Sequence, residues 1–398
     1  MYILMVSRGY PTTNDPQWGC FEKDQAEALA AYGHKVVVVS VDRRFRFRWR
    51  KLGCERKQIN NIPYYNYFLL PSAIASLFIG RERDLLVSER QFRRVFRQVV
   101  QEQGMPDIIY GQFFWNTLRA LPVAKEEHIP IVGIEHWSRF NRCKEEIDAF
   151  TYKNAGKVYR SIDRALVVSE SLKGRMQALF GGEYEVVHNL VGNEFANAYV
   201  PAPIYSKDNT KKSEVLPFTF ISCGSLVHRK GFDLLIEACR GLRIPNDAWQ
   251  LNIIGGGELQ ESLQEQVNAA GLQTHIHLLG TKTKEDIVAL LQQSHAFVLA
   301  SRSENFSVAV LEAMVCGLPV VASICGGIRE CIVEHKNGLL FPVEDVAALR
   351  QAMQDIYDHY AQYNRKAIAE DAIARFGGHA IAQQLTTIFD ETIKTHIS

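Results

Sequence analysis

Two carboxylates stand eight residues apart in "SRSENFSVAVLEAMVCGLPVVAS" (residues 301–323): Glu304 precedes an apolar helical pattern and Glu312 lies within it. A glycoside hydrolase needs two carboxylates that face each other across about 5 to 9.5 Å. Eight residues of helix rise about 12 Å. The spacing therefore does not suit a hydrolytic pair, and it favours two groups that grip different parts of one long ligand.

The loop before that helix is a candidate anion site. The run "AFVLA" predicts a strand, Ser307 can cap the helix, Gly317 suits a left-handed position at its end, and Pro319 prevents its continuation. The N–H groups of residues 305–308 would then lie at a helix N-terminus, where they can bind a diphosphate.

Two residues in the first half of the chain follow predicted strands. His136 comes after "IPIVGI", and Gly19 lies in "QWGCF", between the first strand and the first helix. A lone histidine at a strand end is more often structural than functional. A loop glycine is as readily a plain turn residue as one that lets the backbone approach a phosphate or sugar. The residues alone leave both readings open.

Short apolar runs alternate with amphipathic helical patterns along most of the chain. The runs are continuous, which is typical of parallel strands covered on both faces. They include "YILMV", "KVVVVSV", "DIIYG", "IPIVGI" and "RALVVS" in the first half, and "FTFIS", "QLNIIG", "IHLLG", "AFVLA", "PVVAS" and "GLLF" in the second. We therefore predict an α/β protein with two doubly wound, Rossmann-like domains that face a cleft.

Composition gives the domain boundaries. Residues 1–195 form the first predicted domain, the polar and proline-containing residues 196–216 a linker or loose loop, and residues 217–375 the second domain. Residues 376–398 are predicted to form a C-terminal helix.

Several motifs occur in a fixed order around the two glutamates. They are E-x7-E, "EAM", "GLPVVAS", "GGIRE" (326–330), "NGLL" (337–340) and, upstream, "CGSLVHRKGFDLLIEA". In these motifs the chain resembles the retaining glycosyltransferases of family 4, which have the two-domain GT-B fold. The resemblance implies an acceptor-side first domain, a nucleotide-sugar-binding second domain, and a last helix that crosses back toward the first domain.

The resemblance also implies roles for matching residues. Glu304 would lie near the hydroxyls of the donor sugar, Glu312 would bind the ribose hydroxyls, and Lys230 in "RKG" would neutralise the diphosphate. His136 would position and polarise the sugar. The amides that would cradle the diphosphate belong to Asn305, Phe306, Ser307 and Val308.

The chain departs from the family pattern in two loops. Gly224 is followed by Ser225, where relatives commonly carry an arginine that binds the diphosphate. His228 or Arg229 can supply the missing charge, and we favour Arg229. Many relatives have two adjacent glycines where this chain has Gly19 alone, and this difference bears on the acceptor.

The mechanism implied by the resemblance is transfer with retention of the anomeric configuration. No residue is an obvious covalent nucleophile, and Glu304 is the nearby candidate. No D-x-D triad stands in a suitable loop, so we predict no metal site and activity that survives EDTA. No cofactor is expected; the donor, of UDP or GDP type, is a substrate.

Composition favours a cytoplasmic protein. No window approaches eighteen apolar residues, and the N-terminus lacks the features of a secretory signal. The eight cysteines form no C-x-x-C pair and are scattered through apolar surroundings, which favours reduced thiols.

The stretch "RRFRFRWRK" is basic in a chain whose net charge is +1. Three readings compete: a nucleic-acid groove, a patch that contacts an anionic membrane or a lipid-linked acceptor, and an ordinary exposed loop. Because no nucleic-acid fold signature is present and the rest of the chain is acidic, we favour the membrane reading. The predicted contact residues are Arg43, Arg44, Phe45, Arg46, Phe47, Arg48, Trp49, Arg50 and Lys51.

Together these patterns predict a glycosyltransferase that moves a sugar from a nucleotide diphosphate to a glycan or lipid-linked acceptor, in polysaccharide or cell-surface glycan synthesis at the inner face of the membrane. Two alternatives stay open: a transferase for a small soluble acceptor, and a non-catalytic protein of the same fold that binds sugar nucleotides.

Overall fold

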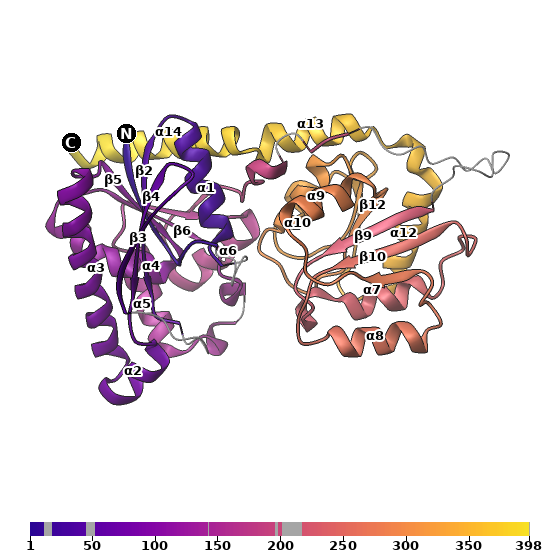
Figure 1. Ribbon diagram of the computed structural model, residues 1–398, viewed down its shortest axis with the longest axis horizontal. Helices are drawn as coiled ribbons and strands as arrows, with labels where there is room; N and C mark the ends of the chain where they lie inside the picture. The colour runs from indigo at the N-terminus through magenta and orange to yellow at the C-terminus, as the bar shows by residue number, and fades with distance from the viewer. Residues whose placement is uncertain (12–17, 45–51, 142, 196–197, 201–216, 398) are drawn as a thin grey trace. The chain divides into compact units, whose positions relative to one another are not determined.

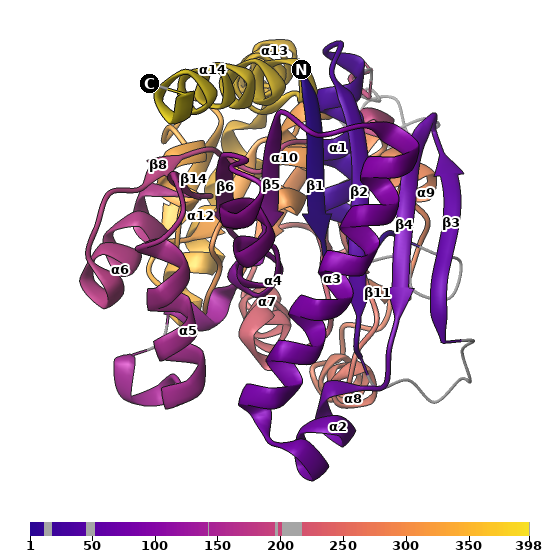
Figure 2. The same cartoon turned by 90° about the vertical axis from the view of Figure 1, so that its left-hand side faces the viewer.

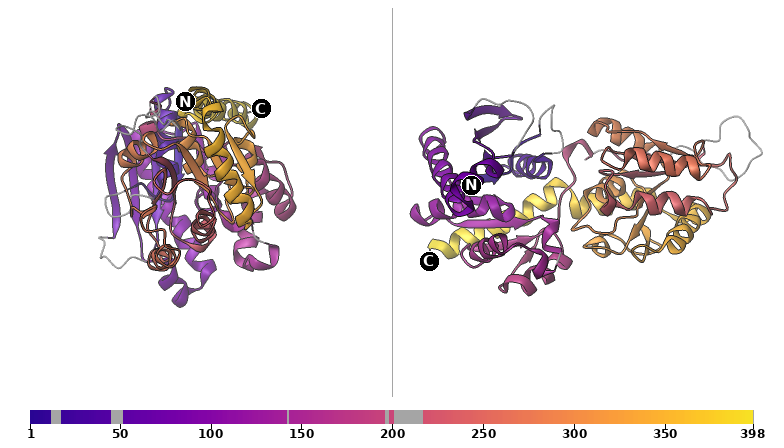
Figure 3. Two further views of the ribbon diagram at one scale, coloured as in Figure 1. Left: turned by 90° about the vertical axis from the view of Figure 1, so that its right-hand side faces the viewer. Right: turned by 90° about the horizontal axis from the view of Figure 1, so that it is seen from below.

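The computed structural model describes residues 1–11, 18–44, 52–141, 143–195, 198–200 and 217–397. It divides into two compact units (Figure 1): unit 1 is Met1–Leu190 with Gly378–Ser398, and unit 2 is Val191–Gly377. Both ends of the chain belong to unit 1 (Figure 3). The sequence-based boundaries stood at 195, 216 and 375, and of the predicted linker only residues 198–200 are described.

Unit 1 is built on a sheet whose described strands run in the order β3-β4-β2-β1-β5-β6-β7-β8 (Figure 2). Neighbours are parallel except for β3 and β4, which form an antiparallel hairpin at one edge. The strands are β1 (Tyr2–Ser7), β2 (Lys35–Asp42), β3 (Gly53–Ile59), β4 (Ile62–Phe68), β5 (Ile108–Gln112), β6 (Ile131–Glu135), β7 (Arg164–Val167) and β8 (Glu185–Val186).

Helices cover both faces of this sheet. α3 and α4 pack on one face, where their apolar residues join those of β1, β2, β5 and β6 in one core. α1 and α14 lie against each other, and Tyr110 of β5 contacts Phe389 of α14 with ring centroids 5.0 Å apart. The helices are α1 (Cys20–Ala31), α2 (Ser72–Ile79), α3 (Arg81–Gln103), α4 (Phe113–Glu126), α5 (Ala149–Tyr159), α6 (Glu170–Phe180) and α14 (Gly378–Ile397).

Unit 2 is built on an all-parallel sheet in the order β11-β10-β9-β12-β13-β14. Its strands are β9 (Phe218–Cys223), β10 (Trp249–Ile254), β11 (Ile276–Leu278), β12 (Ala296–Leu299), β13 (Val320–Ser323) and β14 (Gly338–Phe341). Apolar residues of α7, α8 and α12 form the core on one face, and α10 lies over the other face, packed on α13 (Figure 1). The helices are α7 (Phe232–Cys239), α8 (Gln260–Ala269), α9 (Lys284–Gln292), α10 (Val308–Val315), α11 (Ile328–Cys331), α12 (Val346–His359) and α13 (Arg365–Phe376).

The continuous apolar runs explain why the central strands are parallel. All six residues of β1 are buried, as are all four of β12, which is possible only where helices shield both faces. The predicted α/β class with two doubly wound sheets is confirmed. Within the described residues, no helix is both long enough and apolar enough to cross a membrane.

Candidate active site

The predicted donor-site residues of unit 2 lie on loops that follow β9 and β12. Gly224 comes directly after β9, and a short 3-10 helix, η4 (His228–Lys230), ends at Gly231. Gly231 has φ 65°, and a Cβ there would lie 1.9 Å from the carbonyl oxygen of Ala300. Only glycine allows this approach, which holds the two loops side by side.

Glu304 and Lys230 meet between these loops. Lys230 Nζ donates a hydrogen bond to Glu304 Oε1 at 2.5 Å, and Ser301 Oγ donates to the same oxygen at 2.8 Å. Arg229 Nη1 lies 3.7 Å from the second carboxylate oxygen. The side chains of Glu304 and Lys230 are 8% and 13% exposed, whereas that of Arg229 is 47% exposed. The cluster therefore has two cations for one carboxylate.

Arg302 braces η4 through contacts with its backbone and with α7. Its guanidinium binds Asp233 through two nitrogens, at 2.8 and 2.7 Å, and also donates to the carbonyl of His228 at 2.7 Å. Its own backbone N–H donates to the carbonyl of Arg229 at 2.8 Å. The hydrogen bonds to Asp233 raise the pKa of Arg302, which keeps this brace charged. The sequence analysis missed this residue, although "SRS" stands directly beside Glu304.

The start of α10 departs from the expectation in one respect. Ser307 occupies the N-cap position, but its side chain makes no capping hydrogen bond. The side chain of Phe306 packs on Phe376 of α13, with ring centroids 5.7 Å apart, so only its backbone is available to a ligand. Asn305 accepts a hydrogen bond from the N–H of Gly327 at 2.8 Å through its carbonyl. The helix ends as predicted, because Gly317 has φ 79°.

Glu312 is close enough to Cys223, the last residue of β9, for its charge to affect the pKa of that thiol. Burial raises the pKa of the Cys223 thiol to about 12, the charge of Glu312 adds to this rise, and Lys230 opposes it. The carbonyl of Ser225, the residue that replaces the family's arginine, accepts from the N–H of Val227 at 2.8 Å. Ser225 carries no charge, but the guanidinium of Arg229 lies in the same unit, 3.7 Å from the carboxylate of Glu304.

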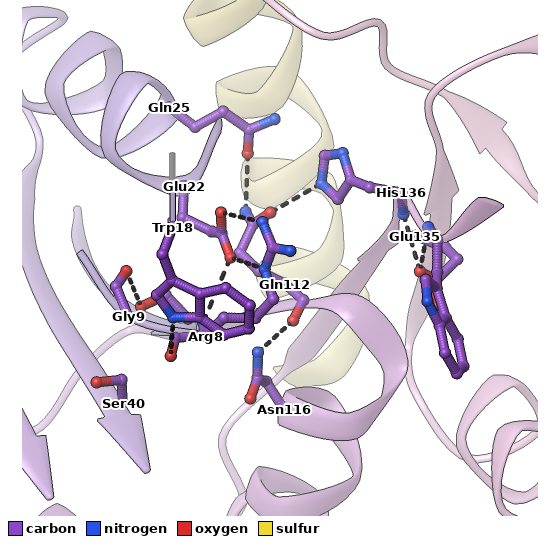
Figure 4. A network of polar contacts seen from close by, with 12 residues as sticks. Arg8, Gly9, Trp18, Glu22, Gln25, Ser40, Gln112, Asn116, Glu135 and His136 are labelled. Atoms are coloured by element: carbon purple, nitrogen blue, oxygen red, sulfur yellow. Dashed lines mark hydrogen bonds and ion pairs between the residues drawn. The ribbon is translucent and has the colours of Figure 1, made fainter. Parts of the chain in front are cut away.

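His136 directly follows β6 in unit 1, and two amide side chains contact its ring. Figure 4 shows the contact with Gln112. The Nε2 of His136 lies 2.9 Å from Gln112 Oε1, and its Nδ1 lies 3.0 Å from Asn189 Oδ1. Burial lowers the pKa of His136 to about 4; the nearby charge of Glu22 opposes this and that of Arg8 adds to it. The imidazole is therefore neutral at physiological pH.

A buried carboxylate fixes the backbone at His136. Glu135 accepts hydrogen bonds from the backbone N–H groups of Phe114, His136 and Trp137, at 3.1, 2.9 and 2.8 Å, and from the Tyr159 hydroxyl at 2.6 Å. Burial raises its pKa despite these bonds. Sequence reasoning passed over Glu135, because its partners come from three separate elements.

Gly19 is required by a close approach within unit 1. It has φ 76°, and a Cβ there would lie 2.3 Å from the carbonyl oxygen of Gly9. The close approach is thus to the chain itself. Nearby, Arg8 binds Glu22 through two nitrogens at 2.7 and 3.0 Å, and its carbonyl accepts from the Trp18 indole at 3.0 Å (Figure 4). The charge on Arg8 holds the pKa of Glu22 below its usual value, although burial alone would raise it.

The predicted membrane patch is wrong at its first residue. Arg43 is buried and binds Asp84, Ser88 and the carbonyl of Leu70, so it is part of the interior of unit 1. Arg44 bonds to Asp42 at 2.9 Å and lies over the Trp18 ring. Residues 45–51 lie outside the described residues. Among the residues that are described, no three His, Cys, Asp or Glu side chains group as metal ligands would.

Two family models match the chain: "Glycosyltransferase Family 4" over residues 23–194 and "Glycosyl transferases group 1" over residues 206–374. The D-rhamnosyltransferase WbpZ of Pseudomonas aeruginosa is 34% identical over 179 residues, which are 44% of this chain and 45% of that protein. The amylovoran biosynthesis glycosyltransferase AmsK of Erwinia amylovora is 31% identical over 194 residues, 46% of this chain and 48% of that one. This chain thus spans about half the length of these relatives.

Solved structures agree over nearly the whole chain. The sucrose-phosphate synthase of Thermosynechococcus elongatus has a TM-score of 0.74 at 18% identity, covering 99% of this chain and 100% of that one. Anabaena HepE, solved with UDP and glucose, has a TM-score of 0.71 at 17% identity, covering 98% and 100%. One family model matches almost entirely within unit 1 and the other within unit 2, and both sheets are doubly wound. The chain therefore belongs to glycosyltransferase family 4 and has the GT-B fold.

Proposed function

We propose that this protein transfers a sugar, with retention, from a nucleotide diphosphate to a hydroxyl of a glycan or lipid-linked acceptor, in polysaccharide or cell-surface glycan synthesis. The observation that carries the proposal is the cluster of Lys230, Arg229 and Glu304. It lies between the loops that follow β9 and β12, which approach each other closely at Gly231. Family membership and relatives named for amylovoran synthesis and rhamnosyl transfer support it.

Donor binding would exchange partners within this cluster. In the free protein the ammonium of Lys230 is bound to Glu304. A diphosphate offers stronger acceptors and more charge, so it would draw Lys230 and Arg229 toward itself. Glu304 would then be free to accept hydrogen bonds from the sugar hydroxyls. The N–H groups at the start of α10 would bind the same diphosphate, and Glu312 the ribose.

Two cations and the helix amides would stabilise the leaving diphosphate without a metal ion. His136 is neutral, so we assign it to positioning the sugar and not to carrying a proton. Because amides contact both ring nitrogens, a sugar hydroxyl would take the place of Gln112 or Asn189 at the ring. We therefore expect EDTA to leave transfer unchanged.

Calorimetry with UDP, GDP and ADP, each in EDTA, tests the donor site. UDP is tried first because the structure of HepE contains it. One nucleotide should bind the wild type, and Lys230→Ala should weaken it roughly tenfold or more, because hydrogen bonds to charged groups contribute about 1.5 to 3 kcal/mol. Arg229→Ala should weaken it less, since Arg229 is more exposed.

Lys366→Ala is the matched control, because Lys366 is an exposed lysine of the same unit paired with Glu370. Absence of binding by all three nucleotides would contradict the proposed function. If Lys366→Ala weakened nucleotide binding as much as Lys230→Ala, the effect would come from the change in net charge and not from the loss of a contact with the diphosphate.

We also propose that the protein works at the cytoplasmic face of a membrane. All eight cysteines are free thiols, as expected in a reducing compartment. Helix α2 exposes Leu77 and Phe78 at 82% and 84%; the exposed Arg83 lies just beyond it, while Arg81 is paired with Asp148. Apolar residues beside arginines are typical of a surface that contacts anionic lipid. This support comes from a segment other than the one that the sequence suggested.

A further inference from the structure

Unit 1 contains a cavity of about 580 Å³ near the carboxyl ends of its strands. Aromatic rings form much of its wall, among them Trp18, Phe113, Trp115, Trp137 and Phe150, and α2 contributes Ser72, Ala73 and Ser76. Its size is that of a site for one or two sugar rings. Aromatic walls suit sugars, because the C–H faces of a sugar ring pack against them.

Five arginines also line the cavity, and four of them have a carboxylate partner. The pairs are Arg8 with Glu22, Arg43 with Asp84, Arg44 with Asp42, and Arg81 with Asp148. Because each charge is matched within the protein, these four arginines need no ligand anion. Of the four, Arg43 acts electrostatically on the fifth.

The fifth, Arg119 on α4, has no ion-pair partner among the described residues. Its Nη1 donates to the side-chain oxygen of Asn116 at 2.7 Å, which is a neutral acceptor. Burial lowers the pKa of Arg119 to about 10; the charge of Arg43 adds to this fall, and those of Asp84 and Asp42 oppose it. The group is therefore still a cation at neutral pH. A largely desolvated cation that no carboxylate contacts directly is costly, and an anion in the cavity would relieve that cost.

The cavity is connected to His136 by a chain of hydrogen bonds. Arg119 donates to Asn116, whose amide donates at 2.7 Å to the carbonyl of Gln112, and the side chain of Gln112 contacts His136. The next residue, Trp137, forms part of the cavity wall. A ligand held there would thus lie beside the residue that we assign to the sugar.

We propose that this cavity binds an anionic sugar of the acceptor, with its carboxylate or phosphate on Arg119 and its ring against the aromatic wall. A guanidinium binds either oxyanion through two parallel hydrogen bonds. The inference rests on the proposed glycosyl transfer and names the acceptor class: a glycan that carries an acidic sugar or a sugar phosphate. In the latter case the phosphate would join the sugar to its lipid.

Titration with three probes tests this inference: methyl glucoside, which is neutral, glucuronate and glucose 1-phosphate. Three of the five tryptophans line the cavity, so binding can be followed by tryptophan fluorescence and confirmed by calorimetry. At least one anionic probe should bind roughly tenfold or more tightly than methyl glucoside, as expected for hydrogen bonds to a charged group. The tighter of the two anions identifies the source of the charge.

Arg119→Met should remove this preference, and Arg119→Lys should restore part of it. Arg97→Met is the matched control, because it removes an exposed arginine of the neighbouring helix α3. Equal binding of neutral and anionic probes by the wild type would overturn the inference, whether or not the variants fold. So would an unchanged preference in Arg119→Met.

UDP binding by unit 2, measured on the same samples, separates the two proposals. Nucleotide binding without anionic-sugar binding would leave the glycosyl transfer standing and remove the acceptor class. Anionic-sugar binding without nucleotide binding would contradict the transfer and leave an anion site in unit 1.

Discussion

His136 shows how a single residue takes its properties from its surroundings. Amide side chains contact both ring nitrogens, and Phe113 lies with its ring centroid 5.0 Å from that of the imidazole. A neutral imidazole has only one N–H, so it can donate to only one of the two amide oxygens that it contacts. The ring orientation is thus set by these contacts, as a group that positions a sugar requires.

The lowered pKa of His136 predicts a pH-dependent stability. Above pH 6.5 the ring is neutral in both states; below it the unfolded chain binds a proton first, so stability is lost as the pH falls from 6.5 to about 4. The full loss is about 3 kcal/mol. Hydrogen exchange of unit 1 peptides between pH 7 and pH 5 should show a shallower loss of stability in His136→Gln than in the wild type.

The exposed His128, replaced by asparagine because its φ is 54°, is the control for that experiment. His295, whose pKa burial also lowers to about 4, lies in unit 2 and stays in every variant. Identical slopes for wild type and His136→Gln would mean that the buried ring accepts a proton in the folded state as readily as in the unfolded one.

At the scale of the elements, Arg302 holds η4 in place, and this role requires no contact between Arg302 and the donor. Arg302 joins Asp233 of α7 to the carbonyls of His228 and Arg229, and it also pairs with Glu344 at 2.8 Å. Its removal would leave Lys230 on a loop with fewer fixed points. Arg302 is therefore a positioning residue.

Arg302→Met should weaken nucleotide diphosphate binding severalfold while the bare nucleoside binds as before, because only the diphosphate depends on Lys230. Calorimetry with UDP and uridine measures both. Arg240→Met is the control, since Arg240 is an exposed arginine that pairs with Glu237 at the end of the same helix α7. Equal losses for UDP and uridine would instead indicate general damage to the unit.

Helix α2 is the element on which membrane contact should depend. Replacing Leu77 and Phe78 together by serine should reduce sedimentation with vesicles that contain anionic lipid by roughly tenfold or more, because each fully buried apolar side chain contributes about 1.5 to 3 kcal/mol. Val333→Ser, which changes a residue that is 51% exposed on unit 2, should have no effect. If the double variant still bound the vesicles, the membrane contact would have to lie on a surface other than α2.

At the scale of the whole molecule, the last helix belongs to the unit in which the chain begins. α14 packs on α1, Thr386 bonds to His34 at 2.7 Å, and His396 lies 3.0 Å from Asp163. Unit 1 therefore gains its last helix only after all of unit 2 has been synthesised.

Phe389→Ala should destabilise unit 1 by about 3 to 5 kcal/mol, the usual cost of such a cavity in a core, and leave unit 2 unchanged. Phe389 is fully buried against Tyr110. Hydrogen exchange resolved by peptide distinguishes the units, and Thr387→Ala, on the exposed side of the same helix, is the control. Equal loss of protection in both units would show that they unfold together.

Much of the fold and of the donor loop could be predicted from local patterns. Continuous apolar runs identify parallel strands wherever helices cover both faces, and the glycine and proline around α10 determine where that helix ends. Ser307 shows the limit of such patterns, because a serine at the N-cap still needs a free N–H within reach of its hydroxyl. Gly19 shows another, because the atom that excludes a Cβ belongs to Gly9, ten residues away.

The sequence by itself determined the parallel strands at the centre of both sheets, the family and the loop that carries Glu304, because each depends on residues close together in the chain. Only the tertiary structure decided which charges are matched. Arg43 is buried on Asp84, Arg8 on Glu22, and Arg119 is left with an amide, through contacts between distant elements. Pairing depends on distance in space, and no spacing along the chain reports it.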